Sequence, residues 1–218
     1  MKRLYIIVEG HTEQYFINNV LRPYLNRFNI YAVTPILVNT SKTGKGGLSN
    51  YEHLRNNITA ILKQEQGDDI VVTTMIDFFK IPTSTPSYIA SMAIQTKKGQ
   101  VSNFESAIDR DINDRRFFSY IQIHEFEALL FANNRGFEEL YSDEVSSQTG
   151  SIVSDYSNPE DINSSPQSAP SKRILSIVKK YNKKVDGSII ALEVGIDDML
   201  KRCPHFREWV EQLINRAN

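Results

Sequence analysis

The stretch LYIIVEGHTE, residues 4–13, decides the fold, because five apolar residues lead directly into an acid, a glycine and a second acid. A continuous apolar run of this length predicts a strand covered on both faces of a sheet. Glu9 and Gly10 end that strand, and a helix is expected to begin at Thr12. This order places Glu9 and Glu13 at the carboxyl edge of the sheet, where open α/β proteins bind ligands.

A second apolar run ends in the same way. Residues 70–76, IVVTTMI, predict another buried strand, and Asp77 follows directly. If the two strands are neighbours, about 4.8 Å separates their backbones, so that their terminal carboxylates can share one cation. Oxygen ligands of this kind suit Mg²⁺ or Mn²⁺. A single acid here is more simply a helix or turn cap, but Glu9 and Glu13 together with Asp77 favour a metal site.

The rest of the chain alternates predicted strands and helices. Further strands are expected at 30–38 and 117–123, and helices at 12–28, 49–66, 86–97 and 103–115. Ser49 with Glu52 and Ser102 with Glu105 are candidate capping boxes. Pro23 is expected to kink or split the first helix, and Pro35 to place its strand near a sheet edge. The pattern predicts an α/β fold with a mainly parallel, four-stranded sheet flanked by helices.

The predicted domain organisation follows from composition. Residues 1–145 form the α/β domain, and residues 146–170 show no periodic apolar pattern, which predicts a flexible linker or loop. Residues 171–218 are expected to form a helical C-terminal extension packed on the same domain. Its helices are predicted at 171–183, 188–201 and 205–217.

Composition excludes several classes of protein. The 218 residues carry a net charge of −1, so that any nucleic-acid binding must come from a local patch. The single Cys203 excludes an internal disulfide and a four-cysteine zinc site. No apolar run approaches the roughly 20 residues that span a bilayer. A soluble, cytoplasmic protein without a membrane partner is expected, as a monomer or a homo-oligomer.

Basic residues offer three places for phosphate. Lys172 follows Pro170 and Ser171 at an expected helix start, where backbone amides favour phosphate, although a solvated lysine is the commoner case. The loop 42–47 is a weaker candidate, since it lacks the Gly-Lys-Ser/Thr ending of a P-loop. The helix expected at 171–183 and the residues after it carry a basic stripe that can follow a nucleic-acid backbone, meet the acidic stretch 138–161, or simply face solvent. The stripe consists of Lys172, Arg173, Lys179, Lys180, Lys183 and Lys184.

The ordered set of motifs resembles a known family. Residues 8–13 resemble the opening motif of Toprim domains, which occur in topoisomerases, primases and overcoming-lysogenization-defect nucleases. Nearly the whole chain resembles a bacterial Toprim-like family of unknown function. The matching segments are Lys45-Gly46-Gly47, Asp77-Phe78-Phe79 before Pro82, residues 124–131, and Pro170-Ser171-Lys172-Arg173.

The resemblance implies a Toprim-like fold and an acidic metal centre. Glu9 takes the part of the Toprim glutamate, as ligand or general acid/base, and Asp77 that of the first aspartate in Asp-x-Asp. Phe79 stands where the second aspartate is expected. Three alternatives follow: Glu125 or Glu127 completes the site, the site binds a single ion, or catalysis has been lost.

Glu125 and Glu127 lie two positions apart, so that on a helix they cannot point the same way. His124 and Glu125, nearest the strand end, are favoured for the site. For Glu127, a buried acid paired with an arginine is an equally good interpretation.

The function implied by the resemblance is that of a Mg²⁺- or Mn²⁺-dependent nuclease or related phosphoesterase. Glu9, Glu13, Asp77, Glu125 and Glu127 are the candidate ligands, and Glu9 and Lys172 the candidate catalytic residues. The expected partners are a nucleic acid, with DNA favoured over RNA, and an ATPase of a bacterial defence or DNA-processing system. The alternative is a catalytically inactive Toprim module that acts as a regulatory or scaffolding subunit. Nucleotide or signalling-ligand binding at the same edge is a third possibility, because fold does not fix function.

Overall fold

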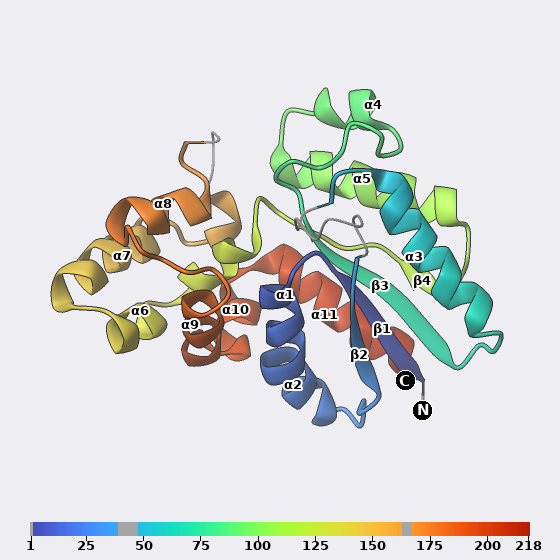
Figure 1. The fold of residues 1–218 in the computed structure, drawn as a ribbon, viewed down its shortest axis with the longest axis horizontal. Helices are drawn as coiled ribbons and strands as arrows, with labels where there is room; N and C mark the ends of the chain where they lie inside the picture. The colour runs from blue at the N-terminus through green and yellow to red at the C-terminus, as the bar shows by residue number, and fades with distance from the viewer. Residues whose placement is uncertain (1, 39–47, 163–166) are drawn as a thin grey trace.

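A parallel sheet flanked by helices forms one half of the molecule, on the right in Figure 1. The computed structural model describes residues 2–38, 48–162 and 167–218. Strands β1 (Arg3–Val8), β2 (Val33–Leu37) and β3 (Ile70–Asp77) pair in the order β2-β1-β3, all parallel. Val8 is in register with Met75, so that β3 runs two residues beyond β1 and Asp77 lies beside the end of β1. The α/β class and the pairing of the two acid-ending strands are confirmed.

The predicted fourth strand consists of two short ones, which gives the sheet five strands. Strands β4 (Phe117–Phe118) and β5 (Ile121–Gln122) both pair in parallel with β3. Between them the Thr74 hydroxyl donates to the carbonyl oxygen of Tyr120 and accepts from its amide, both at 2.8 Å. A side chain of β3 thus replaces the ladder bonds where the strand is interrupted.

Proline positions behave as the sequence indicates. The first helical segment divides into α1 (His11–Phe16), a π-helical turn (Ile17–Leu21) and α2 (Arg22–Asn26), with Pro23 in the first turn of α2. A proline lacks the amide that a helix interior requires, and the wider turn before it accommodates this loss. Pro35 lies in β2, which is an edge strand.

Two helices that cover one face of the sheet begin at residues other than those predicted. The Asn50 side chain caps α3 (Tyr51–Gln64) by accepting from the amide of Glu52 at 3.0 Å. Helix α5 (Lys97–Ile112) follows the short α4 (Tyr88–Met92) and is capped by Thr96, which accepts from Gly99. Both predicted capping boxes are therefore wrong. An asparagine one residue nearer the helix serves α3, and the second box lies inside α5.

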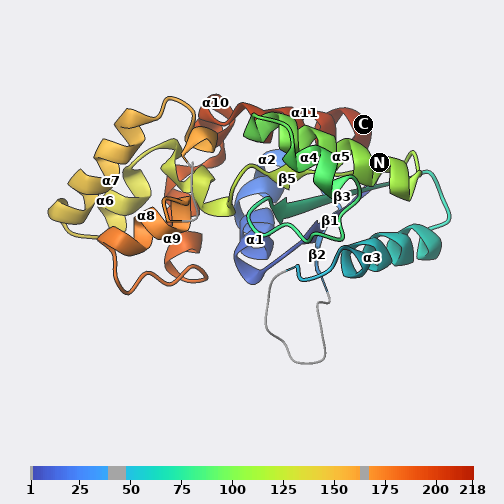
Figure 2. The ribbon, with the colours of Figure 1, turned by 90° about the horizontal axis from the view of Figure 1, so that it is seen from above.

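The C-terminal half is more regular than the sequence indicates. It contains the 3-10 helices η2 (Phe126–Ala132) and η3 (Pro159–Asp161) and helices α6 (Arg135–Leu140), α7 (Asp143–Asp155), α8 (Pro170–Ile177), α9 (Asp186–Val194), α10 (Ile196–Arg202) and α11 (Pro204–Ala217). Helices α6 to α9 gather beyond one end of the α/β part (Figure 2).

Helix α7 corrects the expectation of a flexible linker over 146–170, of which residues 163–166 lie outside the described part. Helix α7 has too few apolar residues to show a helical pattern in the sequence. Polar contacts hold it against the rest of the protein. The Thr149 hydroxyl donates to Asn134 Oδ1 at 2.7 Å, while Arg202 donates to the carbonyl oxygens of Val153 and Tyr156 at the helix end. The proposed domain division itself stays a prediction.

The remaining helix boundaries also differ from expectation. Helix α8 ends at Ile177 rather than 183, and Gly195, with φ of +75°, separates α9 from α10. Only glycine adopts this backbone region readily. Helix α11 begins at Pro204, one residue before the predicted start, and Trp209 Nε1 donates to Thr73 Oγ1 of β3 at 3.1 Å. No helix in the described ranges has the length and apolar content needed to cross a bilayer.

Candidate metal centre

Glu9 fastens the end of β1 to its neighbours. Its Oε1 accepts from the amide of Leu48 at 2.9 Å, and its Oε2 from the amide of Asp77 at 3.2 Å. Burial raises the pKa of the Glu9 carboxyl, and these two amides oppose the shift. The carboxylate is thereby held at the carboxyl edge, as the sequence predicts for its position.

Gly10 leaves space for the Glu13 carboxylate. A Cβ atom at Gly10 would lie 2.8 Å from Glu13 Oε2, closer than such atoms approach. Glu13 lies in the first turn of α1 and its side chain is only 3% exposed. The glycine is needed here for the room it leaves rather than for a left-handed turn, because its backbone is extended.

Asp77 links β3 to the segment that follows β5. Its Oδ1 accepts from the amide of Phe126 at 2.9 Å, which satisfies a donor at the start of η2. Burial raises the pKa of Asp77 well above its usual value. Lys183 opposes that shift, and the nearby Glu13 and Glu9 add to it.

The chain turns sharply at His124, which places the next two acids differently. His124 has φ of +66°, in the left-handed region that non-glycine residues rarely adopt. Glu125 then accepts from the amide of Ser171 at 3.0 Å, at the first turn of α8. Glu127 points to the centre of the site, and its partner there is Lys183 rather than an arginine. The preference for His124 and Glu125 as the residues that enter the site is therefore corrected in favour of Glu127.

The Lys183 ammonium lies between three of these acids, a role that the sequence pattern does not indicate. Its Nζ lies 3.2 Å from Glu13 Oε1, 3.2 Å from Glu127 Oε2 and 3.6 Å from Asp77 Oδ2. We refer to Glu13, Asp77 and Glu127 as the carboxylate cluster. Burial alone would lower the pKa of Lys183, but the three carboxylates raise it well above 10.5. Lys183 was one of six residues in a basic run, and no spacing in that run distinguished it.

Other predicted residues lie outside this cluster. Lys172 is exposed, and within the described residues its side chain makes no hydrogen bond or ion pair. Phe79 supplies no ligand atom; its amide donates to the carbonyl oxygen of His124 at 2.7 Å, and the Lys80 ammonium lies 5.3 Å from its ring centre. The loop 42–47, including Lys45-Gly46-Gly47, is outside the described residues.

The donor chemistry of the cluster fits a hard cation. Carboxylate oxygens are the ligands that Mg²⁺ and Mn²⁺ prefer. Glu127 is 1% exposed, yet neither of its oxygens accepts a hydrogen bond. A buried carboxylate without donors is costly unless a cation faces it. As they stand around the ammonium, however, no three acidic, histidine or cysteine side chains of the described ranges are grouped to hold one metal ion.

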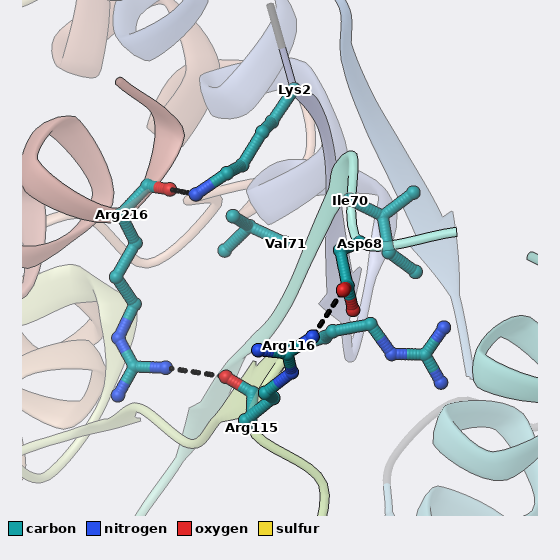
Figure 3. Close-up of a pocket in the computed structure, with 7 residues that line it drawn as sticks. All are labelled: Lys2, Asp68, Ile70, Val71, Arg115, Arg116 and Arg216. Carbon is teal, nitrogen blue, oxygen red and sulfur yellow. Dashed lines mark hydrogen bonds and ion pairs between the residues drawn. The ribbon is translucent and has the colours of Figure 1, made fainter. Parts of the chain in front are cut away.

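A basic cavity of about 250 Å³ lies at the opposite, amino edge of the sheet (Figure 3). Its cationic side chains are already engaged. Lys2 donates to the carbonyl oxygen of Arg216, Arg216 to that of Arg115, and Arg115 pairs with Asp68. The Arg116 guanidinium donates to the Asp114 carboxylate and to three backbone oxygens. These contacts fasten strand starts to the end of α11, so that the carboxyl edge remains the candidate site.

Comparison with known proteins identifies the family. The C-terminal region of the OLD protein of Xanthomonas campestris pv. campestris is 14% identical, covers 100% of this chain and 98% of that chain, and gives a TM-score of 0.46. The corresponding region of the Burkholderia pseudomallei OLD protein is 15% identical, covers 98% of this chain and 99% of that chain, and gives a TM-score of 0.47. No curated protein matches. The family model described as "Domain of unknown function (DUF4276)" matches residues 8–214, and the chain therefore belongs to this family.

Proposed function

We propose that the protein is a Mg²⁺- or Mn²⁺-dependent phosphodiesterase of Toprim type, acting as a nuclease. The observation that supports this most is the convergence of Glu13, Asp77 and Glu127 on a single point at the carboxyl edge of the sheet. The three acids come from α1, β3 and η2, and one of them is buried without a hydrogen-bond donor. Such an arrangement is unfavourable without a cation, which is the property expected of a metal centre.

The proposed roles follow from what each side chain contacts. Glu13, Asp77 and Glu127 would hold the ion, and Glu9, fixed by two backbone amides, would orient the edge or accept a proton. A bound divalent ion would activate water and neutralise phosphate charge. Glu125 holds the amide of Ser171, which sets the start of α8 and with it the position of Lys172.

The substrate and partner in this proposal rest on the resemblance of the sequence motifs. A nucleic acid, with DNA favoured over RNA, would bring its phosphodiester to the cluster. In this proposal Lys172, exposed in the first turn of α8, contacts that phosphate. An ATPase encoded nearby would be the partner that couples the nuclease to a bacterial defence or DNA-processing system.

Binding and cleavage by matched variants test the proposal. Wild type, Glu9→Gln, Asp77→Asn and the exposed control Asp143→Asn are titrated with Mn²⁺ and incubated with plasmid and RNA. We expect Asp77→Asn to weaken Mn²⁺ binding at least tenfold, and both site variants to abolish cleavage, while Asp143→Asn behaves as wild type. Cleavage that persists in Asp77→Asn, or wild type that binds no Mn²⁺, would contradict the proposal.

An inactive regulatory module is the second candidate, and two observations favour it. Lys183 already neutralises part of the cluster, and Phe79 provides no carboxylate. This alternative predicts that wild type cleaves neither substrate even with the neighbouring ATPase and Mn²⁺ present. It also predicts that wild type still binds that ATPase in a pull-down.

A further inference from the structure

Lys183 reaches the carboxylate cluster from the segment between α8 and α9. Hydrogen bonds of Asn182 hold the turn that carries Lys183. The Asn182 amide donates to Asp186 Oδ2 at 2.8 Å, and Asn182 Oδ1 accepts from the amides of Lys184 and Val185. Helix α9, which follows this segment, packs beside α1, since a Cβ atom at Gly187 would lie 3.6 Å from Thr12 Cγ2. Residues far apart in the sequence are thus brought to one edge.

The side chain of Lys183 is more exposed than those of the three acids that its ammonium contacts. It is 41% exposed, whereas the side chains of Glu13, Asp77 and Glu127 are 3%, 14% and 1% exposed. The ammonium therefore contacts oxygens of side chains that are more deeply buried than its own. Because the Lys183 side chain borders solvent, the ammonium has a path out of the cluster.

An ammonium and a divalent ion cannot both occupy this point. Three carboxylate oxygens surround Nζ at 3.2–3.6 Å. Mg²⁺ requires its oxygens at about 2.0–2.1 Å, so the acids must close in on the position that the ammonium now fills. Two cations within about 4 Å of each other also repel strongly in a poorly solvated site.

We propose that Lys183 is an internal counter-ion that a divalent ion must displace, so that metal loading and release of the segment 178–185 are one event. The inference rests on the proposed metal centre and adds its regulation. Whatever draws the ammonium outward raises the affinity for the ion, and by linkage the ion favours the released segment to the same extent. A phosphodiester anion has the charge to do this, so that substrate and metal would bind cooperatively.

Calorimetric titration with Mn²⁺ tests the competition directly. Lys183→Met removes the ammonium and keeps an unbranched side chain, and Lys184→Met is the control, since Lys184 is exposed and neighbours the same turn. We expect Lys183→Met to bind Mn²⁺ at least tenfold more tightly than wild type and Lys184→Met to match wild type. Equal or weaker binding by Lys183→Met would overturn the competition and leave the proposed metal centre standing. If none of the three proteins binds Mn²⁺, both the competition and the proposed metal centre are contradicted.

Hydrogen exchange of the wild-type protein provides a measurement that does not depend on a variant's folding. Backbone amides of residues 178–185 should exchange faster in saturating Mn²⁺ than in EDTA, while those of β1 and β3 should not. Unchanged exchange in this segment under conditions where calorimetry shows bound Mn²⁺ would contradict its release.

Discussion

The protonation of the Glu127 carboxyl links the stability of the protein to pH. Burial raises the pKa of its carboxyl above 4.5, and the Lys183 ammonium is the largest effect in the other direction. The folded protein therefore keeps a proton on this group to a higher pH than the unfolded chain does. Stability contributed by the protonated form is lost as the pH rises from about 4.5 toward the raised pKa.

Glu127→Gln should accordingly flatten the pH dependence of stability in EDTA. Above about pH 4.5 we expect the wild-type free energy of unfolding to lose, with rising pH, a contribution from this group of up to about 1.4 kcal/mol per pH unit. Urea denaturation measured across this range should show a smaller slope for Glu127→Gln. The exposed Glu144→Gln should keep the wild-type slope, and identical slopes for all three proteins would contradict this account.

Gly10→Ala tests the space beside Glu13. The backbone of Gly10 is extended, so alanine fits its conformation, and the free energy of unfolding in EDTA should change by less than about 1 kcal/mol. The added methyl group would displace the Glu13 carboxylate, and Mn²⁺ binding should weaken about tenfold.

A double-mutant cycle checks the cause. In a Glu13→Ala background the clash no longer exists, so that adding Gly10→Ala should leave Mn²⁺ affinity unchanged. If Gly10→Ala weakens binding equally in both backgrounds, it acts through the backbone and not through Glu13.

At the scale of elements, helix starts are satisfied by side chains from distant segments. Glu160, on η3, accepts from the amides of His205 and Phe206 at 2.9 and 3.0 Å, and its side chain is almost fully buried. These are donors in the first turn of α11, whose own cap residue, Cys203, offers no side-chain acceptor. Glu160 performs in space the role that a capping residue performs in sequence.

Glu160→Ala should lower the free energy of unfolding by about 3 kcal/mol, because it leaves two buried amides without an acceptor. Glu160→Gln keeps one side-chain oxygen as an acceptor, so its free energy of unfolding should fall by about half as much. Urea denaturation of the two variants measures this order. A loss of less than about 1 kcal/mol in Glu160→Ala would mean that water replaces the carboxylate.

Long-range contacts of this kind explain why some helices were not predicted from the sequence. The strands and the edge position of β2 were predictable, because apolar runs and Pro35 act locally. Helix α7 was not, since it is docked through Thr149 and Arg202 rather than through an apolar stripe. The end of α8 at Ile177 could not be predicted either, because no glycine or proline follows it directly.

For the whole molecule, one hydrophobic core joins the sheet to the C-terminal helices. A single cluster of buried side chains includes Leu4 and Phe118 from strands, and Ile190 and Trp209 from helices. Tyr120 stacks on Trp209 with ring centres 4.4 Å apart. Separating the C-terminal helices from the sheet would therefore expose this core.

We expect one unfolding transition for the described parts together. Trp209 is the only tryptophan, so its fluorescence reports on the contact between α11 and β3. Its urea midpoint should coincide with that of far-ultraviolet circular dichroism. A fluorescence midpoint that comes distinctly earlier would show that α11 detaches before the sheet unfolds.

The candidate site was predictable to the extent that it follows strand ends. Glu9, Glu13 and Asp77 were expected at one edge because parallel neighbours bring their carboxyl ends together, and they lie there. Lys183 was not, because nothing local connects it to residues more than fifty positions away. The choice of Glu127 over Glu125 depended on the left-handed backbone at His124, which no residue type in that segment announces.

The distance in sequence between Lys183 and its partners also sets an order of events during synthesis. A chain growing from its N-terminus contains Glu13, Asp77 and Glu127 well before the ribosome adds Lys183. Until then the three acids can meet only with solvent ions to neutralise them. The acids of the carboxylate cluster are therefore made before their counter-ion, and free divalent ions in the cell have access to them before Lys183 does.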